Sequence, residues 1–426
     1  MGSTDGRDGV GRTLIGRRSD FRKYWLGESV SSIGSQVTFL ALPLTAIHTA
    51  DASTSEIGLL GVATTVGAIA LTPFVGAWVD TRTVLPIMIW ANVARALLLL
   101  TIPLAYVLAS VTMPLLYGVG LAVSALTCVF DVAVLTYLPR LVSSEDLVDA
   151  NGRVGASISI ADGAGPALGG VLVQLLTAPG AIVADVLSYL FSFAALGRIT
   201  TNEIVPPRDA APRSLLPSGW EGVRFCFTHP QLRLLLLAST WFNAFGLPIF
   251  IIFLVYATQS LSLTASAIGL LLAAVGIGGT LGSVAAGRVG RRLGTGKALV
   301  VSLPTGAAAL AFVPIPSGDT VQWVLGVAFF VHGFATGLFN VHATSLRQAV
   351  TPNGLQGRVN AGYRLFVSGA LPLGAGLAGV LGSALTPRTT ILVASGALAI
   401  GIALFVPFAT AILGPWSTGT SPSPTS

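Results

Sequence analysis

Long apolar segments alternate with short polar ones along almost the whole chain. At about 20 residues per crossing of a hydrocarbon core, this pattern predicts twelve helical spans, near 25–48, 57–79, 84–109, 113–138, 153–177, 181–199, 232–258, 265–287, 297–316, 321–343, 363–386 and 389–411. Apolar runs such as the one from Leu97 to Leu108 are continuous, which favours helices over the alternating strands of a β-barrel. The pattern therefore predicts an all-α membrane protein.

The polar segments give the expected organisation of the chain. Residues 1–20 are expected to form a cytoplasmic tail, and a longer polar segment at 200–231 is expected to form a cytoplasmic central loop. The loop separates a first group of six spans, 21–199, from a second group, 232–413. Residues 414–426 are rich in Ser, Thr and Pro, a composition typical of a disordered tail.

Lysine and arginine residues lie almost entirely in alternate polar segments. Of the 23 basic residues, 21 fall on one side of the predicted membrane; Arg95 lies inside a span and Arg388 on the other side. Basic residues concentrate in cytoplasmic loops, so both termini are expected in the cytoplasm. The expected location is the plasma membrane, crossed an even number of times.

Composition supports lipid as the solvent for most of the chain, which is 53% hydrophobic and only 9% charged. The net charge of +6 does not indicate nucleic acid, because the basic residues are scattered instead of forming one stripe. Cys128 and Cys226 form neither a disulfide framework nor a metal-ligand spacing. No metal or other cofactor is expected.

The two groups of spans repeat each other at a constant offset. Asp131 before one basic loop corresponds to Asn340 before another, and Asn151 corresponds to Asn360; both pairs are 209 residues apart. Transporter folds are commonly built from such repeats, so two parallel six-helix halves are expected. The alternative is that helices rich in glycine and proline resemble one another by composition alone.

Three segments carry a resemblance to a known family, which extends from about Phe21 to Leu413. They are Phe21–Gly27 at the start of span 1, Trp220–Phe225 before span 7 and Gly357–Asn360 before span 11. In this order they resemble the major facilitator superfamily, and within it the branch of enterobactin-exporter-like and macrolide-efflux-like secretion proteins. The resemblance implies two pseudo-symmetric halves of six helices, a small-molecule substrate moved by alternating access, and a monomer.

The loop between spans 2 and 3 is similar to the gating loop of the superfamily, but it lacks the usual trailing basic pair. The matching loop between spans 8 and 9 keeps basic residues and lacks the aspartate. The residues concerned are Gly76, Asp80 and Arg82 in the first loop and Arg288, Arg291 and Arg292 in the second. They are expected either to form a charged hinge or simply to set the topology.

In span 5, Gly165, Pro166, Gly169 and Gly170 resemble part of a motif shared by many antiporters. Small residues allow helices to approach closely, and a proline loosens the helical ladder. The segment is therefore expected either to permit one repeat to rock against another or only to pack tightly.

Charged residues inside the predicted spans each require a partner or a function, because insertion of one costs about 2.5–3.5 kcal/mol. Away from the ends of the spans they are Glu28, Arg95, Asp131, Asp162 and Asp185, and all lie in the first half. Arg95 and Asp131 differ in predicted depth by only ~5 Å, so a buried pair is expected. We expect Asp131 to be the principal proton carrier, assisted by Glu28 and tuned by Arg95, with Asp162 as a further candidate. A static Arg95–Asp131 ion pair is the alternative, and for Asp185 a structural role is favoured.

Other residues are expected to line a substrate cavity. Ser32 and Gln36 continue a polar stripe from Glu28 along one face of span 1. In the second half the candidates are Trp241, Asn243 and Asn340, among aromatic residues that suit a greasy cavity with few polar anchors.

The sequence lacks HExxH, Gly-x-Ser-x-Gly and GxxxxGK[ST] patterns, so metalloprotease, hydrolase and ATP-driven pump functions are each without their key residues. An enzyme is not expected. The favoured hypothesis is a secondary transporter that exports an amphipathic drug, antibiotic or siderophore in exchange for protons. Import of a small solute is one alternative, and a membrane sensor without transport is another.

Overall fold

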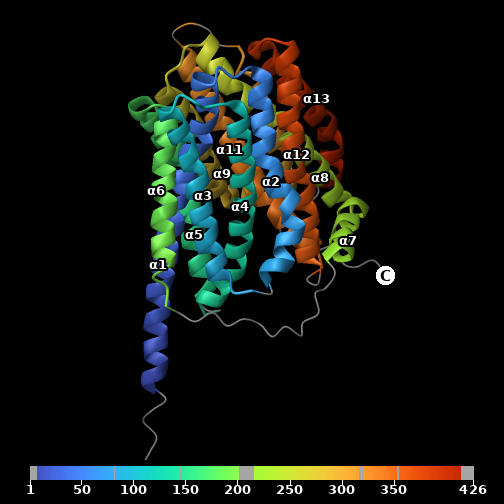
Figure 1. The fold of residues 1–426 in the computed structure, drawn as a ribbon. Coiled ribbons are helices and arrows are strands. Elements are labelled where there is room, and N and C mark those ends of the chain that lie inside the picture. The colour runs from blue at the N-terminus through green and yellow to red at the C-terminus, as the bar shows by residue number, and fades with distance from the viewer. Residues whose placement is uncertain are drawn as a thin grey trace, which may run out of the picture. The chain divides into compact units, whose positions relative to one another are not determined.

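The computed structural model describes residues 7–80, 82–143, 146–200, 215–315, 318, 320–352 and 355–413. Within these ranges, the side chains of residues 7–18, 73, 76, 77, 80, 148, 215–220 and 413 are outside the description. The tail expected at 414–426 also lies outside the described residues. All regular structure in the described part of the chain is helical (Figure 1).

The helices divide between two compact units, one made of residues 1–50 and 63–213, the other of residues 51–62 and 214–426. Along the first part of the chain run α1 (Arg7–Thr49), α2 (Thr54–Asp80), α3 (Val84–Val107), α4 (Met113–Leu141), α5 (Leu147–Leu176) and α6 (Ala178–Leu196). The second part contains α7 (Leu215–Thr228), α8 (Pro230–Val255) with the π-helical turn η1 (Tyr256–Ser260), α9 (Ala265–Leu293), α10 (Thr295–Ala311), α11 (Val321–Val350), α12 (Gln356–Ala384) and α13 (Pro387–Leu413).

Eleven of the described helices are long and apolar enough to cross a membrane. The remaining expected span, 297–316, corresponds to α10, whose 17 residues extend ~26 Å and so come close to the thickness of a hydrocarbon core. Every predicted span coincides with one long helix. The prediction of an all-α membrane protein with twelve long helices is therefore confirmed.

Two polar segments differ from the expected tail and loop. Helix α1 extends back to Arg7, so it includes most of the residues expected in the tail. The central segment contains α7, an amphipathic helix whose Val223 and Cys226 are buried while the intervening Arg224 is exposed. Hydropathy alone missed α7 because it buries too few residues to register as an apolar span.

In the first unit, α1 packs against α5 and α6, and α3 packs against α6 and α4. The contact between α1 and α6 depends on Gly34, where an added Cβ would lie 2.6 Å from Oδ1 of Asp185. Such a distance is too short for any side chain, so glycine sets the spacing of these two helices.

In the second unit, α11 packs against α9 and α10, and α8 packs against α12 and α13. The glycines of α9 and α11 meet reciprocally: Gly278 and Gly282 face the backbone of Phe330 and Phe334, while Gly333 and Gly337 face the backbone of residues 275 and 279. A Cβ at any of these four positions would collide with a main-chain carbonyl group. The two backbones therefore touch with no side chain between them.

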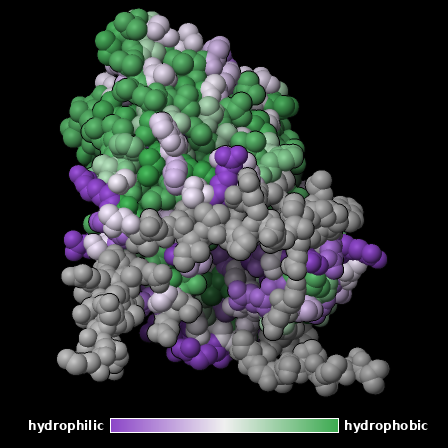
Figure 2. Space-filling view, turned by 60° about the horizontal axis from the view of Figure 1, so that its bottom comes forward, coloured by the Kyte–Doolittle hydropathy of each residue, from purple (hydrophilic) through white to green (hydrophobic). Residues whose placement is uncertain are grey.

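Large apolar side chains cover much of the surface, among them Trp90, Leu97, Leu175 and Trp323. Figure 2 shows a broad apolar area bordered by hydrophilic residues. Such a surface is expected for a protein whose helices face lipid.

Candidate functional site

A cluster of buried polar groups lies in the first unit, and Glu28 on α1 is its most unusual member. One carboxylate oxygen of Glu28, Oε2, is buried and has no hydrogen-bond partner among the described residues. The carboxylate interacts electrostatically with Arg95 and Asp131. Tyr24, one turn earlier on α1, is fully buried, and its hydroxyl likewise lacks a partner in the described part of the chain.

Arg95 on α3 is only 3% exposed and lies between two aromatic rings. Its guanidinium carbon is 4.3 Å from the ring centre of Phe130 on α4 and 4.3 Å from that of Tyr189 on α6. Its Nη2 donates to Oδ1 of Asn92 at 2.5 Å, and the Asn92 amide donates to Ser192 on α6 at 2.9 Å. Cation–π contacts of this kind are strongest where water is excluded, so Arg95 holds three helices together.

Asp185 on α6 is the second carboxylate of the cluster, with 1% of its surface exposed. Its Oδ2 accepts from the Thr38 hydroxyl at 2.5 Å and its Oδ1 from the Ser188 hydroxyl at 3.0 Å. It also interacts electrostatically with Arg95. Both oxygens are thus satisfied, in contrast to the carboxylate of Glu28.

Asp131 is exposed on α4 and directly follows Phe130, whose ring packs under Arg95. The structure therefore brings Glu28, Arg95 and Asp131 into one neighbourhood. It also gives Arg95 partners that the sequence did not indicate, namely Asn92 and the two aromatic rings.

The polar stripe predicted on α1 divides between neighbouring helices. Gln36 donates to Asp162 of α5 at 2.6 Å, and Ser35 shares a hydrogen bond of 2.9 Å with the Tyr189 hydroxyl of α6. Asp162 is exposed and Ser32 is half-buried. Asp162 is thus tied to α1 and does not contribute to the contacts described around Arg95.

The small residues of α5 lie at the contact with α1. A Cβ added at Gly165 would lie 2.5 Å from Cβ of Gln36, and one added at Gly169 would lie 3.2 Å from Cα of Val37. Pro166 and Gly170 are buried in the same region. The motif therefore marks a close approach of two helices.

The residues expected in the gating loops lie at helix ends. Gly76 is in α2 and Asp80 is its last residue, but their side chains are outside the description. The Arg82 guanidinium lies 5.3 Å from the ring centre of Trp78. Arg288, Arg291 and Arg292 are exposed near the end of α9, where positive charge is favourable to the helix dipole.

The cavity candidates of the second unit make hydrogen bonds between helices. Trp241 donates from Nε1 to the Ala397 carbonyl at 3.2 Å and packs on Phe245 at 4.4 Å between ring centres. The Asn243 amide donates to the Val367 carbonyl of α12 at 2.9 Å. Asn340 is exposed on α11. The indole N–H of Trp241 and one of the two N–H groups of the Asn243 amide are thus used in contacts within the protein.

Two segments that carried the family resemblance meet in the second unit, at the contact of α7 with α12. Glu221 forms an ion pair with Arg358, and a Cβ on Gly222 would collide with the Arg358 carbonyl. The Cys226 thiol is buried and lies 3.7 Å from the Val359 carbonyl. Burial raises the pKa of the Cys226 thiol, and the nearby Arg347 acts in the opposite direction. The segments are far apart in sequence, but they form one structure that fixes α7 on α12.

The described residues contain no group of three or more His, Cys, Asp or Glu side chains that could hold a metal ion. The cluster in the first unit consists of the half-buried carboxylate of Glu28, the buried carboxylate of Asp185, the buried guanidinium of Arg95 and the phenols of Tyr24 and Tyr189.

Comparison with protein families decides the class. The model of the Major Facilitator Superfamily matches residues 24–367 and 236–422. The chain belongs to the major facilitator superfamily. It is therefore a multi-pass membrane protein of a transporter family, and the resemblance found in the sequence is confirmed.

Curated members of the superfamily resemble the chain at low identity. An enterobactin exporter, EntS of Citrobacter koseri, is 25% identical over 280 residues, which is 64% of this chain and 64% of EntS. An uncharacterized MFS-type transporter of Sinorhizobium fredii is 28% identical over 251 residues, 58% of this chain and 60% of that protein. The matches thus span less than two thirds of these relatives.

Solved structures of superfamily members share the fold. A bacterial homologue of the human lysosomal transporter Spinster, inward-facing and unoccupied, matches with a TM-score of 0.74 at 14% identity, covering 96% of this chain and 99% of that one. A bacterial homologue of the iron transporter ferroportin, also inward-facing, gives 0.71 at 19% identity, with 92% and 98% covered. At these identities the likeness establishes the major facilitator fold alone.

Proposed function

We propose that this protein is a secondary active transporter that exports small amphipathic organic compounds in exchange for protons, by alternating access and as a monomer. Export is supported by the similarity to enterobactin exporters. Proton coupling rests on one observation: Glu28 has a buried carboxylate oxygen without a hydrogen-bond partner among the described residues, beside Arg95 and Asp131.

The position of Glu28 suits a carboxylate that changes its protonation state during transport. Burial favours the neutral form of a carboxyl group, whereas a nearby guanidinium favours the charged form. A movement that changes the distance between Glu28 and Arg95 would therefore load or release a proton. Asp185 suits this role less well, since hydrogen bonds from Thr38 and Ser188 already satisfy its charged form.

Asp131 and Asp162 have a different part in this proposal. Asp131 is exposed beside the cluster and would pass protons between Glu28 and water. Asp162 is bound to Gln36 and would support the contact between α1 and α5. The sequence predicted Asp131 as the principal proton carrier. The buried carboxylate oxygen of Glu28, which has no hydrogen-bond partner among the described residues, now favours Glu28 for that role.

The second half of the chain contains far fewer acidic residues than the first, which supports the proposal that protons are carried in the first half. From residue 232 to 413 the only acidic residue in the sequence is Asp319, between two predicted spans. Asn340, the counterpart of Asp131, is polar but does not titrate at neutral pH. Proton handling is therefore assigned to residues 21–199, and the second half, 232–413, would supply mainly apolar contacts to the substrate.

The test is transport in inverted membrane vesicles with an imposed gradient, acidic inside, using enterobactin and ethidium as probes. Wild-type protein should accumulate at least one probe, and Glu28→Gln should lose gradient-driven accumulation while still exchanging labelled for unlabelled probe at equilibrium. Asp162→Asn is the matched control and should keep driven accumulation. Gradient-driven accumulation by a folded Glu28→Gln variant would show that Glu28 does not couple protons.

A second pair of variants separates coupling from structure at Asp131. Asp131→Asn should fold and lose most driven transport, and adding Arg95→Gln should not restore it. If Asp131→Asn instead misfolds and the double variant regains both folding and transport, Asp131 and Arg95 form a static ion pair.

A further inference from the structure

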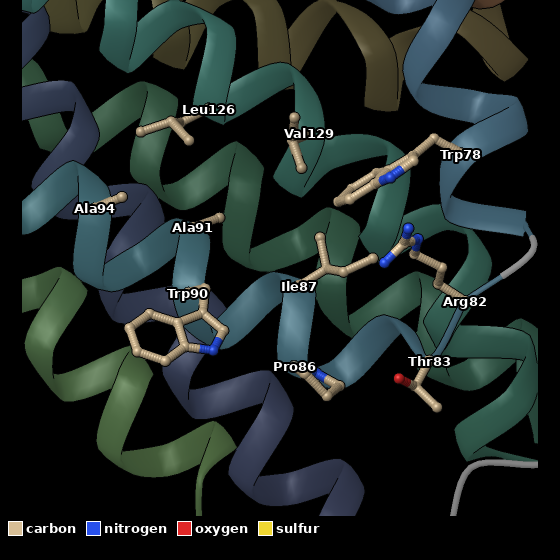
Figure 3. A pocket seen from close by; sticks show the side chains of 10 residues that line it. All are labelled: Trp78, Arg82, Thr83, Pro86, Ile87, Trp90, Ala91, Ala94, Leu126 and Val129. Atoms are coloured by element: carbon tan, nitrogen blue, oxygen red, sulfur yellow. The ribbon is translucent and has the colours of Figure 1, made fainter.

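A groove opens on the first unit between the end of α2, the first half of α3 and the middle of α4 (Figure 3). It has a volume of about 840 Å³. Two tryptophans flank it, Trp78 from α2 with 43% of its surface exposed and Trp90 from α3 with 70% exposed. None of the residues in the cluster of polar groups around Arg95 lines this groove.

The two ends of the groove differ in chemistry. One end carries the guanidinium group of Arg82, which is exposed beside the Trp78 ring. Arg140 of α4 does not line the groove, but its Nη1 donates to the Arg82 carbonyl at 3.4 Å, which brings a second guanidinium group close to this end. The other end is lined by small and aliphatic side chains, Ala91 and Ala94 of α3 and Leu126 and Val129 of α4. The groove thus joins a positive end to an apolar channel.

The length of the groove matches one leaflet of a bilayer. Along α3 it runs from Thr83 to Ala94, which is eleven residues or ~16 Å at the rise of an α-helix. A hydrocarbon core is about 30 Å thick, so the apolar part reaches about the middle of the membrane. On α4 the path from Val129 to Arg140 has the same length, also ~16 Å, and ends at the same arginines.

We propose that this groove binds an anionic phospholipid of the bilayer. The phosphodiester group would lie between the guanidinium groups of Arg82 and Arg140, which suit phosphate oxygens. One acyl chain would occupy the channel formed by Ile87, Ala91, Ala94, Leu126 and Val129. Trp78, near the end of α2, would lie at the depth of the headgroup and glycerol, where tryptophan is enriched. Trp90 lies seven residues past Thr83, ~10 Å along α3, and would pack beside the acyl chain.

Charge complementarity selects this occupant. A zwitterionic lipid would bring a choline or ethanolamine cation toward the same two arginines, whereas phosphatidylglycerol brings only negative charge. A basic residue near an anionic lipid surface strengthens binding by about 5-fold. The site is independent of the substrate and of the direction of transport, and it would adjust the α2–α3 connection to the lipid composition of the membrane.

The experiment is native mass spectrometry of the delipidated full-length protein in detergent, titrated with dioleoyl phosphatidylglycerol or dioleoyl phosphatidylcholine. We expect a first phosphatidylglycerol to bind more tightly than phosphatidylcholine. Arg82→Gln should weaken it by about 5-fold, and Arg82→Gln with Arg140→Gln by about 25-fold, if the two arginines contribute alike. Millimolar inorganic phosphate should not displace the lipid, because phosphate lacks the acyl chain.

Two further variants test the geometry. Ala94→Phe fills the apolar end without changing charge and should weaken both lipids. Arg291→Gln, which removes an exposed arginine at the end of α9, is the matched control and should bind phosphatidylglycerol as the wild type does. Equal binding of the two lipids by wild-type protein would overturn the proposal. So would an equal loss in Arg291→Gln and Arg82→Gln, because the preference would then be a property of the whole surface.

Discussion

Replacing Arg95 should destabilise the first unit more than any exposed arginine does. The side chain makes two ring contacts at 4.3 Å and a hydrogen bond to Asn92 in a site that is 3% exposed. A desolvated cation–π contact contributes up to about 2 kcal/mol, and a hydrogen bond from a charged donor about 1.5–3 kcal/mol. Because these contributions are not additive, we expect Arg95→Gln to cost about 3–5 kcal/mol of unfolding free energy.

The loss has a second component, which can be separated from the first. Glu28 and Asp185 both interact electrostatically with Arg95, so its removal leaves two carboxylates without their cation. Glu28→Gln in the Arg95→Gln background should therefore recover about 1–2 kcal/mol, because one uncompensated charge is gone. Arg95→Lys should fall between wild type and Arg95→Gln, since an ammonium retains the charge but not the planar stacking.

The assay is reversible unfolding in mixed micelles of mild detergent and dodecyl sulfate, followed by circular dichroism for the two single variants, the double variant and wild type. Arg364→Gln, which removes an exposed arginine of α12, is the control and should change the unfolding free energy by less than about 0.5 kcal/mol. If Arg95→Gln is no more destabilising than Arg364→Gln, the interpretation of Arg95 as a link between α3, α4 and α6 is wrong.

Three further predictions address packing, reactivity and topology. Gly169→Leu should abolish transport by protein that still inserts, because overpacking against α1 costs about 1–3 kcal/mol. Gly155→Leu is the control in the same helix; an added Cβ there meets nothing within 4 Å, so this variant should transport normally in the same flux assay. Equal activity of the two variants would contradict the packing argument. The Cys226 thiol is buried and its pKa is raised, so it should react with a water-soluble maleimide more slowly than a free thiol peptide at neutral pH, and faster as the pH rises. Glu221→Gln breaks the ion pair with Arg358 and should speed the reaction. Rapid labelling of native protein would show that α7 does not stay on α12. A reporter fused to either end should give a cytoplasmic signal, because 21 of the 23 basic residues lie on one side, and a periplasmic signal from either fusion would reverse the topology.

The fold was largely predictable because hydropathy reports directly on the lipid environment. Each long helix contains one predicted span. Hydropathy did not indicate two helical parts outside the spans, namely the start of α1 at Arg7 and the helix α7 inside the expected central loop. An amphipathic helix at a surface buries only one face, so its mean hydropathy resembles that of a loop.

The candidate site was predictable in part. Charged residues inside apolar spans indicated Glu28 and Arg95, and depth along the helices placed Asp131 near them. Depth cannot indicate the direction in which a side chain points, so the roles of Asn92, Tyr189 and the pairing of Gln36 with Asp162 were missed. One signal was available: Asn92 and Arg95 are three residues apart in an otherwise apolar helix, a spacing that places them on one face.

The direct contact between the backbones of α9 and α11 also limits how the second unit can deform. Side chains that separate two helices let them slide by changing rotamers, but Gly278, Gly282, Gly333 and Gly337 leave no side chain to adjust. A displacement that brought a residue with a side chain to any of these four contacts would place its Cβ against a main-chain carbonyl group. The pair should therefore move as one rigid element during the transport cycle, and a covalent cross-link between α9 and α11 should leave the turnover rate unchanged.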